Sequence, residues 1–276
     1  DPAESGEFYI PRIYWTSRAD TLAVVTLNRL QNTMKLYFFD VRTGGKRQVM
    51  SETSTTWVDV YDFFAGVHDL MTFPAGATQF FWISDRDGWP HIYRYDYSGR
   101  LVNQVTRGPW SATRIAGIDA RAQTIYYLST EAGAVQRQLY SIKFDGTAPR
   151  RITQTAGTHG IDMSPDTRFF IDRWSSTSRP HQVEMWATGA TGAQKLRTME
   201  DNAAVTTWLQ THAYAPTELF TFTTSDSVRI DASMIRPPDF DSTRSYPVIL
   251  TVYGGPGSQA VYDRWGSSGW SQWLAQ

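Results

Sequence analysis

The feature that most constrains the fold is a strand-and-turn pattern that recurs along the greater part of the chain. Each copy is an alternating strand that ends in a polar residue and a glycine turn, followed by a returning strand. If Tyr37, Tyr93, Tyr140 and Met185 occupy equivalent positions, successive copies lie 56, 47 and 45 residues apart. A period of about 40 to 50 residues with four short strands per unit is typical of β-propeller blades. The pattern therefore predicts a mainly β chain with about four blades.

Composition agrees with a β protein and excludes several other classes. Aromatic residues make up 14% of the 276 residues and charged residues 19%, a balance that suits aromatic-lined sheets. The chain has no cysteine, which excludes disulfides, cysteine nucleophiles and thiolate metal sites. A formal charge of −1 provides no electrostatic footprint for nucleic acid. No apolar run is long enough for a membrane-spanning helix, so no membrane segment is predicted.

Four blades do not make the closed ring that this architecture needs to hide its sheet edges. Residues 1–198 are therefore assigned to propeller blades, and residues 199–276 to a second domain. The family resemblance described below implies that the blades are the C-terminal half of a propeller, that the second domain is a truncated start, and that the chain is an interior piece of a longer protein.

The pattern changes in the last third of the chain. Residues 200–210 predict a helix that Asp201 or Asn202 caps, and residues 217–235 predict a hairpin that turns at 225–227. Residues 248–252 form a short, mostly β-branched apolar run, which predicts a strand buried on both faces, as in a parallel sheet. This run breaks at a Gly-Gly-Pro-Gly turn. Residues 265–276 predict a second helix whose inward side chains are Trp270, Trp273 and Leu274.

The turn after the apolar run resembles a family motif. The sequence from Tyr253 to Gln259, Tyr-Gly-Gly-Pro-Gly-Ser-Gln, is similar to the Tyr-Ala/Gly-Gly-Pro-x-Ser-Gln segment of the dipeptidyl peptidase IV family, a branch of the prolyl oligopeptidase-like serine peptidases. Met199-Glu200-Asp201-Asn202 resembles the Leu-Glu-Asp-Asn that comes before it in that branch. The resemblance covers nearly the whole chain and implies an eight-bladed propeller followed by an α/β-hydrolase domain, whose first strands would be residues 199–276.

The resemblance also implies roles for individual residues. In an α/β-hydrolase the loop after the third strand supplies an oxyanion-hole donor, and the hydroxyl of Tyr253 would be that donor. Gly254, Gly255 and Pro256 would shape the substrate-binding loop. Residues 56–61 are similar to a propeller loop that lends an aromatic wall to the substrate pocket, and Tyr61 would be that wall. The alternative is a tight turn after a core strand, with Tyr253 as a space-filling side chain.

The other chemistry of a serine peptidase is not found in these residues. The sequence lacks G-x-S-x-G; we reject Ser271 as the nucleophile because Trp273 stands where the strained elbow needs glycine. No histidine follows His212, so the Ser-Asp-His triad cannot be completed. His181 and Glu184 would point to opposite sides of a strand, and residues 85–88 fit a turn better than a calcium loop. No metal site and no cofactor are predicted.

The sequence is thus predicted to be part of a serine exopeptidase that releases N-terminal dipeptides, with proline or alanine in the second position. This chain alone is expected to be inactive. The resemblance implies peptide substrates, a periplasmic or extracellular location and a parent that can be homodimeric. The alternative is a non-catalytic receptor or scaffold with an inactive hydrolase domain, and a tripeptidyl specificity also stays open.

Overall fold

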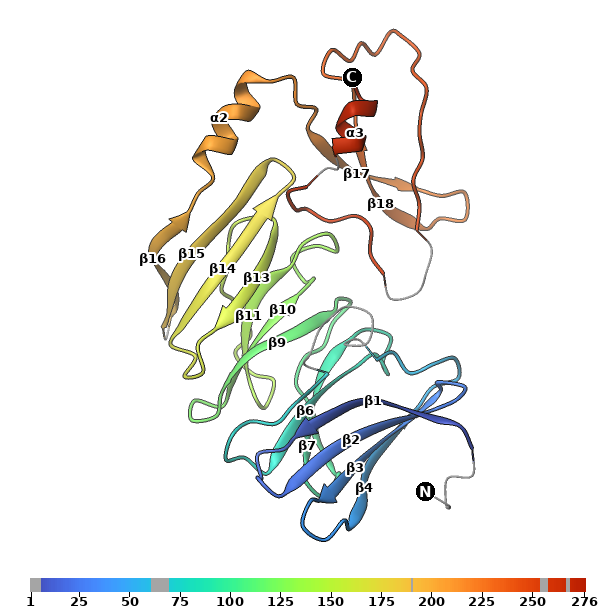
Figure 1. Ribbon diagram of the computed structural model, residues 1–276, viewed down its shortest axis with the longest axis vertical. Helices are drawn as coiled ribbons and strands as arrows, with labels where there is room; N and C mark the ends of the chain where they lie inside the picture. The colour runs from blue at the N-terminus through green and yellow to red at the C-terminus, as the bar shows by residue number, and fades with distance from the viewer. Residues whose placement is uncertain (1–5, 61–69, 190, 254–257, 267–268) are drawn as a thin grey trace. The chain divides into compact units, whose positions relative to one another are not determined.

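Four four-stranded sheets follow one another along the part of the chain that the computed structural model describes, residues 6–60, 70–189, 191–253, 258–266 and 269–276 (Figure 1). The spatial order of the strands in each sheet follows the chain order, so each sheet is a meander. Strands pair antiparallel in the first, second and fourth sheets. The sixteen strands of these sheets are β1 (Phe8–Trp15), β2 (Thr21–Asn28), β3 (Thr33–Asp40), β4 (Lys46–Thr53); β5 (Met71–Thr72), β6 (Gln79–Ser84), β7 (His91–Asp96), β8 (Leu101–Gln104); β9 (Ala112–Asp119), β10 (Thr124–Ser129), β11 (Gln138–Lys143), β12 (Arg150–Arg151); β13 (Thr158–Met163), β14 (Phe169–Ser176), β15 (Arg179–Gly189) and β16 (Gly192–Glu200).

The chain divides into two compact units, and the first comprises Asp1–Leu128 with Ser141–Arg150. Its core is rich in aromatic rings that come from the strands of the first two sheets and from the turn after β7. Phe38 meets Tyr97 edge-on with the ring centroids 5.1 Å apart, and Phe80 stacks on Tyr95 at 5.4 Å. Aromatic pairs in these geometries contribute beyond their buried area. The many aromatic side chains thus fill the core of this unit.

The turn after the third strand of a sheet is built in the same way in the first three sheets. Asp40 accepts hydrogen bonds from the backbone amides of residues 42 and 43, Asp96 from those of 98 and 100, and Asp145 from that of 147. The hydrogen bond from the Ser98 hydroxyl is the largest of several contacts that lower the pKa of Asp96 to about 2. The Asp-and-glycine turn that defined the sequence repeat is therefore confirmed as a structural unit.

The glycines of two of these turns also touch the sheet that comes before theirs in the chain. Gly99, with φ +95°, has no room for a side chain: a Cβ there would lie 1.8 Å from the carbonyl oxygen of Val49 in β4. A Cβ on Gly146 would lie 2.9 Å from the carbonyl oxygen of Val105, just after β8. Each turn is thus packed against the outgoing strand of the preceding sheet, and glycine permits that approach.

The second unit comprises Ser129–Tyr140 and Arg151–Gln276 and carries the remaining elements: α2 (Ala203–Thr211), β17 (Thr217–Thr223), β18 (Arg229–Ile235) and α3 (Gly269–Leu274). The predicted helix and hairpin are confirmed. Asn202 occupies the N-cap position, but its side chain makes no capping hydrogen bond, while the carboxylate of Asp201 accepts from the amide of Ala203 at 3.0 Å. The hairpin turns at 225–227, where the amide of Thr224 donates to the carbonyl of Val228. None of the described helices is both long and apolar enough to cross a membrane.

Two burial predictions for this unit are wrong. The run from Val248 to Val252 forms no strand and is exposed, with 87%, 69%, 82% and 78% of the surface of Val248, Ile249, Leu250 and Val252 accessible. A strand buried in a parallel sheet needs neighbours on both edges, and no described strand pairs with this one. The second helix forms only over α3, and its Trp270 and Trp273 stack on each other at 5.0 Å while each stays 65% exposed. Leu274 is also exposed.

Candidate functional site

Tyr253 ends the exposed apolar run and is itself 66% accessible. Gly254, Gly255 and Pro256 lie outside the described residues, as does Tyr61. An accessible side chain is compatible with a hydroxyl that donates to a substrate.

The segment that follows the Gly-Gly-Pro turn is fixed to distant parts of the second unit. Arg137 donates from Nη2 to Oε1 of Gln259 at 2.6 Å, and Nε2 of Gln259 donates to the carbonyl of Ala134 at 3.0 Å. The backbone amide of Asp263 donates to the carbonyl of Val135 at 2.8 Å. The motif that carries the family resemblance is therefore continued by a well-anchored stretch of chain.

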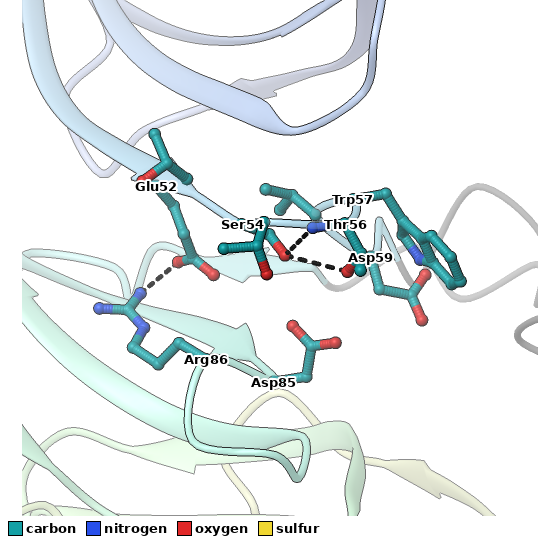
Figure 2. A pocket seen from close by; sticks show the side chains of 10 residues that line it. Glu52, Ser54, Thr56, Trp57, Asp59, Asp85 and Arg86 are labelled. Carbon is teal, nitrogen blue, oxygen red and sulfur yellow. Dashed lines mark hydrogen bonds and ion pairs between the residues drawn. The ribbon is translucent and has the colours of Figure 1, made fainter.

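A cavity of about 420 Å³ opens in the first unit, between the loop after β4 and the end of β6 (Figure 2). Its walls are residues 52–59 together with Asp85 and Arg86. Four of these ten residues, 56–59, belong to the loop at 56–61 that the sequence suggested for a substrate wall. Trp57, half-exposed, is the large aromatic side chain of that lining.

Glu52 lines this cavity and makes several polar contacts. Its buried carboxylate accepts hydrogen bonds from the indole Nε1 of Trp82, at 3.0 Å, and from the Ser84 hydroxyl, and it forms an ion pair with Arg86 (Figure 2). Arg86 also donates to the hydroxyl of Tyr95 at 2.6 Å. Burial alone would lower the pKa of Arg86, but the charge of Glu52 and the contact with Tyr95 together raise it. These contacts fix the start of the loop after β4, because the charges of Glu52 and Arg86 are paired with each other.

The remaining charge of the lining is negative. Asp59 and Asp85 add two carboxylates, whereas the one guanidinium is already paired with Glu52. Burial, and next the charge of Asp87, raise the pKa of Asp85. Such a cavity favours a cationic or hydrogen-bond-donating group over an anion.

The predicted turn at 85–88 is confirmed by a 2.7 Å hydrogen bond from the amide of Gly88 to the carbonyl of Asp85.

His181 is exposed and Glu184 buried on β15, so the two side chains do point to opposite sides of the strand. Ser271 lies within the six-residue helix α3, and no described residue among 258–266 belongs to a strand. A nucleophile elbow needs a strand leading into it, so this placement agrees with the rejection of Ser271.

Sequence reasoning missed a buried pair in the second unit. The Nδ1 of His159 lies 2.8 Å from Oδ2 of Asp172, and its Nε2 lies 3.1 Å from the carbonyl oxygen of Thr155. The carboxylate of Asp172 and the carbonyl of Thr155 can each accept a hydrogen bond from a ring nitrogen that carries a proton. Both side chains are almost fully buried, and burial raises the pKa of Asp172. His159 is one of five histidines that are scattered through the sequence. The pairing of β13 with β14 brings it beside Asp172, and no local motif indicates that contact.

Comparisons with known proteins point to one family. The family model described as the dipeptidyl peptidase IV (DPP IV) N-terminal region matches residues 1–181. A protein of Aspergillus flavus named probable dipeptidyl peptidase 4 is 29% identical over 280 residues, which cover 100% of this chain and 36% of the relative. The crystal structure of Porphyromonas gingivalis dipeptidyl peptidase 4 has a TM-score of 0.87 and 34% identity, and the match covers 97% of this chain and 37% of that one.

A second solved structure supports the fold alone. The putative dipeptidyl aminopeptidase IV of Bacteroides ovatus has a TM-score of 0.82 at 20% identity, over 99% of this chain and 41% of that one. The chain therefore has a β-propeller-like architecture, and it spans little more than a third of the length of the curated relatives that it matches.

Proposed function

The chain belongs to the dipeptidyl peptidase IV family, and from that premise we propose that it is part of a serine exopeptidase that releases N-terminal dipeptides from peptides. The substrates would be peptides with proline or alanine in the second position. Residues 1–198 would be four blades of the propeller, and residues 199–276 the start of the hydrolase domain. The triad would come from the rest of the full-length protein.

The packing of the sheets supports the assignment of blades. The turn glycines Gly99 and Gly146 repeat one contact, each against the last strand of the preceding sheet or the residue just after it. A contact that recurs from one unit to the next is what radial repetition requires.

The exposed apolar run supports the assignment of a hydrolase start. Val248 and Leu250 are more than four-fifths accessible, which is costly for side chains of this type in water. Relatives such as that of Aspergillus flavus are nearly three times as long as this chain, since the match covers 36% of the relative. We propose that strands from the remainder of the full-length protein pair with this run and bury it.

Tyr253 carries the proposed chemistry. When the substrate carbonyl is attacked, its oxygen gains negative charge, and a phenolic hydroxyl that donates to it stabilises the transition state more than the ground state. Gly254, Gly255 and Pro256 would let the loop approach the substrate, and Tyr61 would line its pocket. The single observation behind this assignment is the position of the tyrosine at the head of the family motif, directly after the apolar run.

Tyr253→Phe in the full-length protein tests the assignment. The change removes one hydrogen-bond donor and almost no volume, so kcat for glycyl-prolyl-p-nitroanilide should fall on the order of 10²–10³-fold with KM little changed. Tyr246→Phe is a matched control, because that hydroxyl accepts from the amide of Asp241 within the same stretch of chain. If kcat for Tyr253→Phe stays within about threefold of wild type, the loss is far smaller than the loss of an oxyanion donor would cause. Tyr253 would then be removed from the catalytic residues.

A further inference from the structure

The part of the chain that follows the fourth sheet returns to that sheet. Helix α2 leads away from β16, and none of its residues is buried. The hairpin of β17 and β18 comes next, and residues 259–265 then come back to contact β13 and β14. We call residues 259–265 the docked segment. Its contacts are additional to the covalent connection through α2.

Gln259 begins the docked segment with a contact on each side of its amide group. Nη2 of Arg137 donates to its Oε1 at 2.6 Å, and its Nε2 donates to the carbonyl of Ala134 at 3.0 Å. The guanidinium carbon of Arg137 also lies 5.2 Å from the ring centroid of Tyr262. An aromatic face attracts a guanidinium, and more strongly where water is partly excluded. One arginine thus holds two residues of the docked segment.

Asp263 fixes the middle of the docked segment, and only 9% of its surface is accessible. Its Oδ1 accepts a hydrogen bond from the amide of Thr177 at 2.9 Å. Its carbonyl accepts from the hydroxyl of Thr158 at 2.9 Å, and its amide donates to the carbonyl of Val135 at 2.8 Å. A hydrogen bond to an ionised carboxylate is stronger than one between neutral groups, so Asp263 is the main anchor of the segment.

The surface that receives the docked segment is one packed body. The amide of His159 donates to the carbonyl of Arg137 at 3.0 Å, and residue 137 forms a parallel bridge with Thr158. Gly157 lies so close to β14 that a Cβ there would be 2.3 Å from the carbonyl oxygen of Ser175. Thr158 is itself paired with Ser175 in the register of β13 and β14. Arg137, Thr158 and Ser175 therefore hold fixed places relative to one another.

The docked segment also holds the residues that lead into the hairpin. The ring of Trp265 stacks on that of Tyr214 with the centroids 5.4 Å apart, and the amide of Trp265 donates to the hydroxyl of Ser175 at 3.0 Å. The side chain of Gln272 bridges the amide and the carbonyl of Ala215, at 3.0 and 2.7 Å, and Ala215 is fully buried. Trp265 thus contacts the fourth sheet with its amide and the start of the hairpin with its ring.

We propose that the docked segment is a strap that fastens the second domain to the last blade of the propeller. The boundary proposed at residue 198 separates the segment from the sheet residues that bind it, yet both belong to one compact unit, Ser129–Tyr140 with Arg151–Gln276. If the strap holds the two parts together, the fourth sheet and the hairpin unfold in one cooperative step. This inference uses the proposed domain boundary and no part of the proposed chemistry.

Pulsed hydrogen exchange of the full-length protein in increasing urea tests the strap. Mass spectrometry of peptic peptides follows the strands β13–β16 and the hairpin separately. In wild type both should lose protection at the same urea concentration, because the strap couples them. In Asp263→Ala the anchor is removed, and the two midpoints should separate by about 0.5 M or more.

Asp241→Ala is the matched control. The carboxylate of Asp241 also accepts from a backbone amide, that of Thr243 at 2.9 Å, but this contact closes only a local turn. The variant should therefore keep the common midpoint of wild type. Separate midpoints in wild type would overturn the coupling of the two parts, and a common midpoint in Asp263→Ala would overturn the role of the docked segment.

Hydrogen exchange without urea reports the docking itself. In Asp263→Ala the amide of Trp265 should exchange about 5- to 100-fold faster, although its own acceptor, the hydroxyl of Ser175, is unchanged. Unchanged exchange at Trp265 would overturn Asp263 as the anchor. If Asp263→Ala does not fold, Thr158→Val removes a hydroxyl that donates to the segment and must change both readouts in the same direction. A folded full-length protein without peptidase activity would overturn the proposed function, whereas these readouts would still decide whether the strap exists.

Discussion

Gly99→Ala is the sharpest test of the sheet packing. The substitution adds one methyl group at a turn where the backbone has φ +95° and where the new carbon would lie 1.8 Å from the carbonyl oxygen of Val49. Ordinary contact begins near 3.4 Å, so the turn and the neighbouring strand would have to separate. Neither atom is the flexible end of a side chain, and the backbone of one sheet must move against the next.

The magnitude follows from a comparison with a second glycine. Gly88 has the same φ of +95° but nothing within 4 Å of its Cβ position. Gly88→Ala therefore measures the backbone strain alone, which we expect to cost about 1–3 kcal/mol. Gly99→Ala carries the same strain and adds an overpacking cost of roughly 1–3 kcal/mol. Gly146→Ala should fall between them, because its nearest neighbour, the carbonyl oxygen of Val105, lies at 2.9 Å.

Urea denaturation of the three variants, followed by tryptophan fluorescence, gives the shift of each midpoint from wild type. The predicted order of destabilisation is Gly99→Ala, then Gly146→Ala, then Gly88→Ala. If Gly99→Ala and Gly88→Ala shift the midpoint equally, the turn does not pack against β4, and the repeated contact between successive sheets would be refuted.

Three further substitutions test the buried and surface charges. Asp172→Asn should lower the free energy of unfolding by about 1–3 kcal/mol, because His159 loses its buried carboxylate partner; no measurable loss in urea denaturation would argue against that contact. Glu52→Gln should cost about 1.5–3 kcal/mol, because Arg86 loses its carboxylate partner although 29% of its side chain stays exposed to water; an unchanged urea midpoint would argue against that ion pair. The turn contacts lower the pKa of Asp96 from its ordinary value near 4 to about 2. Asp96 therefore stabilises the fold at pH values above about 4, and this contribution is lost as the pH falls toward 2. Asp96→Asn should therefore be less stable at neutral pH and show a smaller decrease in melting temperature between pH 4 and pH 2, and a decrease identical to wild type would contradict the turn contacts.

The sequence predicted those elements that depend on interactions between residues close together along the chain. The strand-and-turn repeat around Tyr37 and Tyr93 follows from side-chain alternation and from aspartate and glycine turn chemistry, which act within a few residues. The hairpin β17–β18 and the helix α2 were predictable for the same reason. Contacts between residues that are distant in the sequence could not be predicted, because nothing near Gly99 in the sequence indicates that Val49 lies against it.

The candidate site was predictable only in part. Tyr253 stands out because its motif is contiguous, whereas Arg137 and Asp263 are separated by more than a hundred residues and share no motif. The buried pair of His159 and Asp172 depends on the register of two strands, which the sequence does not specify by spacing alone. The run at 248–252 was predicted as buried because its composition demands sheet neighbours, and the described chain contains none for it.

The most direct test of the central claim is the identity of the products that the full-length protein releases. A synthetic peptide with a free N-terminus and proline in the second position is incubated with the purified protein, and the products are identified by mass spectrometry, beside the same peptide with an acetylated N-terminus. The account predicts release of the intact N-terminal dipeptide from the free peptide and no cleavage of the acetylated one. Release of single amino acids or tripeptides, cleavage at internal bonds, or no cleavage of either peptide would contradict it.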